Sequence, residues 1–206
     1  VADEMVKVFN KTEGMCLVWC SGQNIDRLIS VRDACQRSGR QLILDMYTAE
    51  IVRAADDDAG PKPGKEGVTG FLPYGQKQKI KREKAFHISN RHYPHRIYPE
   101  ALAEAASNSA MIFRPSMLRD LDRAKCLSGA SLISSLWSGY VHRSHKELDQ
   151  MEALGIERTH IHTSGHATVD ELRKFVDAIP ARRVIPIHLE DRDGFAELSD
   201  RVEIKN

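Results

Sequence analysis

The sequence lacks several features that would assign it to a class at once. No apolar run approaches the roughly 18 residues of a membrane-spanning helix, and the opening residues do not form a signal peptide pattern. The four cysteines contain no C-x-x-C pair, and Cys16 and Cys20 bracket an apolar run. We therefore expect no membrane association, buried reduced cysteines and a cytoplasmic location. The 30 basic and 29 acidic residues nearly balance, so overall charge indicates no partner.

Short apolar runs alternate with amphipathic stretches along the 206 residues, which are enough for one large domain or a domain with a smaller lobe. This alternation is typical of right-handed βαβ units. It predicts strands over residues 16–20, 41–45, 110–114, 131–137, 158–163 and 183–187, and helices over residues 25–38, 99–106, 116–125 and 168–179. The predicted fold class is α/β with a largely parallel sheet.

The alternation breaks over residues 56–98. An Asp-, Gly- and Pro-rich stretch predicts a loop, and a basic segment follows it. Between residues 60 and 84 there are seven Lys or Arg against two Glu, a local net charge of +5. The run 77–84 is either a solvated helix face or a surface that binds phosphates, with Lys77, Lys79 and Lys81 as its candidates. Three histidines at positions 87, 92 and 95 match no common metal-site spacing.

Near the end of the chain, histidines occur on both sides of a predicted helix. Thr168 and Glu171 form a T-x-x-E capping box, which predicts that the helix begins at Val169. Residues 164–166, Ser-Gly-His, precede this helix N-terminus, where backbone N–H groups favour anions. His188 directly follows the predicted strand 183–187. If that strand is parallel to its neighbour, both histidines reach one sheet edge; otherwise they are ordinary surface residues.

Two stretches resemble the β-CASP nucleases of the metallo-β-lactamase superfamily, the group that includes ribonuclease J. Ser-Gly-His at 164–166 and Pro-Ile-His at 186–188 match the order and spacing of the family's last two motifs. Asn24 and Arg27 occupy the positions of an Asn-x-x-Arg turn that opens the β-CASP domain. The resemblance covers residues 4 to 190, although Leu189 stands where family members commonly have Gly.

The resemblance implies a role for each matched residue. His188 would bind one of two zinc ions, and His166 would act beside the scissile phosphate as a proton donor or electrostatic stabiliser. Ser164 and Gly165 would hold phosphate oxygens, with Asn24 and Arg27 as further phosphate-binding candidates. The family's H-x-H-x-D-H zinc signature is absent from these residues. One imidazole cannot hold a zinc pair, so we expect this chain alone to be inactive.

The same resemblance divides the chain into a Rossmann-like β-CASP domain over residues 1–137 and a C-terminal segment of the metallo-β-lactamase domain over residues 138–206. It implies a metal-dependent hydrolase that cleaves phosphodiesters, most simply a ribonuclease. The expected partners are RNA or another nucleic acid and a missing N-terminal lactamase half, on the same or another chain, with a homodimer also open. The alternatives are a non-catalytic nucleic-acid-binding module and a metallohydrolase of small-molecule esters. A dinucleotide-binding protein is disfavoured, because "SGQNID" lacks the required glycine spacing.

Overall fold

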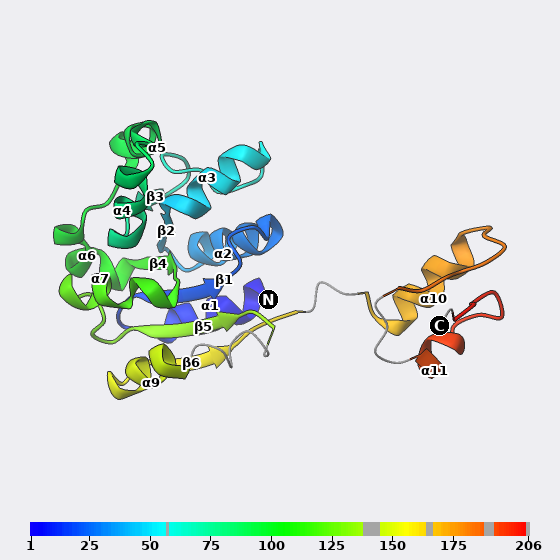
Figure 1. Ribbon diagram of the computed structural model, residues 1–206. Helices are drawn as coiled ribbons and strands as arrows, with labels where there is room; N and C mark the ends of the chain where they lie inside the picture. Colours follow the sequence, from blue (N-terminus) through cyan, green and yellow to red (C-terminus); the bar gives the residue numbers. More distant parts are fainter. Residues whose placement is uncertain (57, 138–144, 164–166, 188–191, 205–206) are drawn as a thin grey trace. The chain divides into compact units, whose positions relative to one another are not determined.

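The structure is a computed structural model that describes residues 1–56, 58–137, 145–163, 167–187 and 192–204. The chain divides into two compact units, Val1–Thr163 and Ser164–Asn206 (Figure 1). No helix among the described residues has the length and apolar character to cross a membrane.

The first unit is built on a six-stranded sheet in the order β3-β2-β4-β1-β5-β6, and every neighbouring pair is parallel. This confirms the predicted α/β class. The strands are β1 Cys16–Cys20, β2 Gln41–Asp45, β3 Val68–Phe71, β4 Ser109–Ile112, β5 Ser131–Ser135 and β6 Glu157–His160. The helices are α1 Ala2–Lys11, α2 Ile25–Arg37, α3 Met46–Ala55, α4 Tyr74–Arg82, α5 Phe86–His92, α6 Pro99–Ala105, α7 Leu118–Arg123 and α9 His145–Ala153. Short 3-10 turns are η1 Tyr93–His95, η2 Ala106–Asn108 and η3 Pro115–Met117.

Helices cover both faces of the sheet, which explains why its strands are continuous apolar runs. Along β1, Cys16, Val18 and Cys20 pack with α1, α2 and α3, whereas Leu17 and Trp19 pack with α6, α7 and α9 (Figure 1). The four cysteines are all free and buried, as expected from their spacing. Burial raises the pKa of the Cys20 thiol to about 12, so it is no ready nucleophile.

The connections define where ligands would bind. The helices that follow β1 and β2 lie on one face of the sheet, and the helix that follows β4, which sits between them, lies on the other. At the carboxyl ends of β1, β4 and β2, the chain therefore turns toward one face of the sheet after β1 and β2 and toward the opposite face after β4. Such a switch point is where open parallel sheets bind ligands.

The structure corrects the prediction in the segment 56–98. Four of its residues form β3, an edge strand that pairs with β2. The strand is short and contains Gly70, where an added Cβ atom would lie 2.6 Å from Cε of Met46. A glycine at that position allows close packing against α3. Because glycine has a low β propensity, it also explains why the sequence pattern did not predict this strand.

In the second unit, α10 Val169–Ala178 has Thr168 as its N-cap. Both hydrogen bonds of the predicted capping box are present. Helix α11 Arg192–Ala196 follows. The predicted strand over residues 183–187 is wrong. The described part of this stretch makes only one isolated bridge, from Val184 to Val202, and Pro186 lacks the N–H that a ladder needs.

The break between the compact units follows Thr163, and the division into domains at residue 137 stays a prediction. Strand β6 pairs with β5 along four residues and so belongs to the first unit. The assignment of residues 138–206 to a lactamase-type segment stays a prediction.

Candidate functional site

The turn after β1 carries the residues of the Asn-x-x-Arg motif. Asn24 is the N-cap of α2, and its Oδ1 accepts a hydrogen bond from the backbone N–H of Arg27 at 2.9 Å. Arg27 is 7% exposed, although its guanidinium is charged. Its Nη2 donates to the hydroxyl of Thr163 at 2.8 Å and to the Thr163 carbonyl at 3.4 Å. Arg27 thus holds the chain immediately before Ser164.

Several buried polar atoms around this turn lack hydrogen-bond partners among the described residues. They are Nη1 of Arg27, the hydroxyl of Ser135 at the end of β5, and Nδ1 of His162 after β6. Burial lowers the pKa of His162, and the positive charge of Arg27 lowers it further. Each of these three atoms has an open hydrogen-bonding position at one sheet edge, which a ligand or a bound water could occupy.

A second arginine lies at the same edge, after β4. Arg114 donates from Nε to the buried carboxylate of Asp45 at 3.1 Å and from Nη2 to the hydroxyl of Thr48 at 3.1 Å. Its guanidinium stacks 4.7 Å from the ring centre of Tyr47. A Cβ atom on Gly22 would lie 2.7 Å from Arg114 Nη2, so glycine there lets the Arg114 side chain approach the turn after β1 closely. Asp45 also caps α3 by accepting from the Thr48 amide at 3.2 Å. This aspartate is structural, because its oxygens are already engaged.

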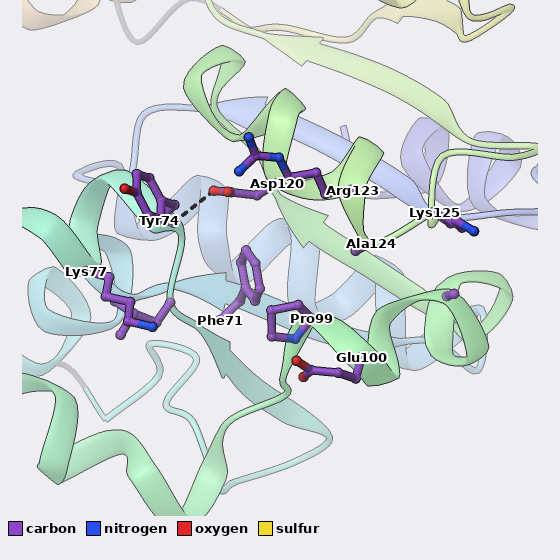
Figure 2. A pocket seen from close by; sticks show the side chains of 11 residues that line it. Phe71, Tyr74, Lys77, Pro99, Glu100, Asp120, Arg123, Ala124 and Lys125 are labelled. Carbon is purple, nitrogen blue, oxygen red and sulfur yellow. Dashed lines mark hydrogen bonds between the residues drawn. The ribbon is translucent and has the colours of Figure 1, made fainter.

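The basic run lies on α4, which is held to the fold by the buried Ile80. Lys77, Lys79 and Lys81 are all exposed. Lys77 also lines a cavity of about 400 Å³ beside Tyr74, between α4, α6 and α7 (Figure 2). Whether these lysines bind phosphates stays a prediction.

The nearby histidine segment has a structural role at one position. His92 is buried and contacts Glu50 on α3, which also pairs with Arg91 and Arg53. Within the described ranges, no group of three or more His, Cys, Asp or Glu side chains is arranged to hold a metal ion.

Four residues of the predicted site lie outside the described residues: Ser164, Gly165, His166 and His188. Their arrangement relative to Arg27 and to each other therefore stays a prediction. Three residues of this edge, Arg114, Ser135 and His162, were not predicted from the sequence. Arg114 ends the predicted strand 110–114, which is the one signal that would have suggested it, whereas Ser135 and His162 lie inside the predicted strands 131–137 and 158–163.

Residues 155–205 match the model of a family described as RMMBL, the Zn-dependent metallo-hydrolase RNA specificity domain. A search of curated proteins found no match. The matched segment begins before β6 and includes 164–166 and His188. The match relates residues 155–205 to zinc-dependent metallo-hydrolases and to RNA specificity.

Proposed function

We propose that this chain is the β-CASP-containing part of a zinc-dependent ribonuclease, and that it binds RNA but does not cleave it alone. The match of residues 155–205 to an RNA specificity domain of metallo-hydrolases carries the proposal. The parallel sheet before it, with cations at its carboxyl edge, supplies a surface that suits a phosphodiester.

Within the first unit, the proposal rests on a contact between two segments that are far apart in the sequence. Arg27 from α2 holds Thr163, and Thr163 directly precedes the Ser164-Gly165-His166 element. A phosphate oxygen near this edge would supply the partner that Nη1 of Arg27 lacks. In the proposal, Ser164 and Gly165 hold phosphate oxygens, and His166 gives a proton to the leaving oxygen.

His188 is proposed as the chain's single zinc ligand. The described residues supply no further ligand set, so no catalytic step can be derived for this chain by itself. The partner in the proposal is therefore a lactamase half that bears H-x-H-x-D-H, on the same or another chain. The second unit has apolar side chains available for such a contact, because Phe175 is 63% exposed and Ile187 is 81% exposed.

The test compares the 206-residue chain alone with the same chain joined to a lactamase half that bears H-x-H-x-D-H. Both are incubated with a labelled single-stranded RNA, a matched DNA and a small-molecule ester, with zinc or a chelator. We expect both proteins to bind RNA and only the longer one to cleave it, with cleavage lost in the chelator. Ester hydrolysis without RNA cleavage would contradict the proposal.

One observation favours a second candidate, a non-catalytic RNA-binding module. The described residues present exposed lysines but no metal-binding group. A complete reading frame without H-x-H-x-D-H, whose product binds RNA and leaves it intact, would select this candidate.

A further inference from the structure

We propose that the cavity beside Tyr74 binds one nucleobase of single-stranded RNA, with the cations at its rim holding the neighbouring phosphates. The proposal rests on RNA as the partner of this chain and adds a specific contact surface. The cavity lies between α4, α6 and α7, and none of the residues matched to a known motif lines it.

The floor of the cavity is apolar. Phe71 at the end of β3, Pro99 and Ala103 on α6, and Ala124 after α7 contribute to its lining. Figure 2 shows the Phe71 ring and the Pro99 ring beside each other in the middle of the cavity. At about 400 Å³, the cavity is in the size range of small-molecule sites and has room for a planar base.

An aromatic side chain stands at the cavity with most of its ring uncovered. Tyr74 is 58% exposed, so it offers apolar surface for stacking. Its backbone is held in place, because its N–H donates to the Asp120 carboxylate of α7 at 2.9 Å (Figure 2). The side chain of Pro73, the N-cap of α4, offers no acceptor, so Asp120 accepts this hydrogen bond from another helix. The backbone of Tyr74 is thus anchored at the cavity, and its ring is open for a base to stack on.

The rim carries more positive than negative charge. Lys77, Arg123 and Lys125 line it, and all three side chains are exposed. Ion pairs between described residues include none of these three. Of the two acidic rim residues, Asp120 is engaged with α4, which leaves Glu100. Three uncommitted cations around an apolar floor suit an aromatic ring flanked by phosphates.

The rim continues onto α4, and this continuity favours a chain of nucleotides over a single small anion. Lys81 follows Lys77 one turn along that helix, on the same side, and is exposed. A base in the cavity would place the adjoining backbone along these two cations. Because the cavity stacks a base without reading its edge, it would accept any sequence in which that base is unpaired.

The experiment measures the affinity of the whole 206-residue chain for a labelled oligoribonucleotide of about ten nucleotides by fluorescence anisotropy, over a series of salt concentrations. Tyr74→Ala should weaken binding about 5- to 100-fold with an unchanged salt slope, because stacking is lost and no phosphate contact is. Tyr74→Phe should bind like the parent. Tyr93→Ala is the matched control, since Tyr93 is 65% exposed and lies outside the cavity.

Two further measurements locate the contact and exclude other occupants. An RNA with one photoreactive 5-iodouridine should crosslink to the peptide that contains Tyr74. An acidic peptide of equal charge should bind weakly and be unaffected by Tyr74→Ala. Equal affinities for the Tyr74→Ala and Tyr93→Ala variants would overturn the cavity proposal and leave RNA binding in place. Failure of the parent chain to bind any RNA would overturn RNA as the partner instead. If the acidic peptide bound as tightly as the RNA and lost affinity in the Tyr74→Ala variant, the occupant of the cavity would be an acidic protein.

Discussion

The Nε2 atom of His92 lies 2.7 Å from Oε1 of Glu50, and this contact ties α5 to α3. Arg91 donates to the same carboxylate at 2.7 Å. Burial alone would raise the pKa of Glu50. The hydrogen bonds from Arg91, His92 and Arg53 outweigh burial and hold this pKa at about 2. The cluster is therefore a stabilising ion-pair network rather than part of a metal site.

The first prediction concerns this carboxylate. Glu50→Gln removes the charge at nearly constant shape and should lower the free energy of unfolding by about 1–3 kcal/mol near neutral pH. The pKa of Glu50 is about 2 in the fold and 4.5 in the unfolded reference, so its contribution is complete above the reference value. It is lost as the pH falls from 4.5 toward about 2. Urea unfolding along this pH range should show parent and variant converging. Glu104→Gln, at an exposed position on α6, is the control and should change little.

An element of the fold can be predicted when the residues that determine it are neighbours in the sequence. Strands β1 and β2 are buried on both faces, so they are unbroken apolar runs that any periodicity analysis finds. Strand β3 has four residues with a glycine among them, and its place in the sheet depends on pairing with β2. The wrong strand at 183–187 has the apolar composition of a strand but, among the described residues, only a one-residue bridge.

In the candidate site, local features could likewise be predicted from the sequence, whereas contacts between distant residues could not. The capping box at Thr168 and the cap at Asn24 are local patterns, and both are present. The pair of Asp45 and Arg114 joins residues 69 positions apart, and Arg27 reaches Thr163 across 136 positions. Contacts of this kind follow from the strand order, which the sequence pattern alone does not determine.

A second prediction concerns Arg27. Arg27→Ala should free the chain at Thr163, because it removes both hydrogen bonds to that residue. Amide hydrogen exchange over residues 161–163 should become faster, and RNA affinity should fall by about tenfold if Nη1 also contacts phosphate. Arg32→Ala is the control, because Arg32 lies on the same helix but pairs with Glu66. A similar loss of RNA affinity in both variants would remove Arg27 from the proposed site.

The basic face of α4 gives a third prediction. Replacing Lys77, Lys79 and Lys81 with Glu should weaken RNA binding and flatten its salt dependence, by about 0.7 in the log–log slope for each lost phosphate contact. Reversing the exposed Lys7 and Lys11 on α1, which covers the other face of the sheet, is the control. An unchanged slope in the α4 variant would mean that this run is only a solvated helix face.

The apolar surface of the second unit gives a fourth prediction. Phe175→Ser and Ile187→Ser together should reduce the binding of a hydrophobic dye, since both side chains are largely exposed. They should also weaken association with a lactamase half supplied on another chain. Val176→Ser is a contrasting variant, because Val176 is 4% exposed and its replacement should destabilise the unit itself. A parent chain that stays monomeric and binds little dye would argue against a partner on this surface.

The last prediction separates the two histidines of the proposed active site. In the complete enzyme, His188→Ala should lower both zinc occupancy, measured by native mass spectrometry, and RNA cleavage, because an imidazole ligand is lost. His166→Ala should keep the zinc and lower the rate of cleavage by about 10²–10⁴-fold, the range expected when a general acid is removed. The isolated chain should bind zinc weakly in either form. Equal zinc loss in the two variants would mean that His166 is a ligand rather than the proton donor. Tight zinc binding by the isolated chain would place its ligands elsewhere, and His87 and His95 would then be the first residues to replace.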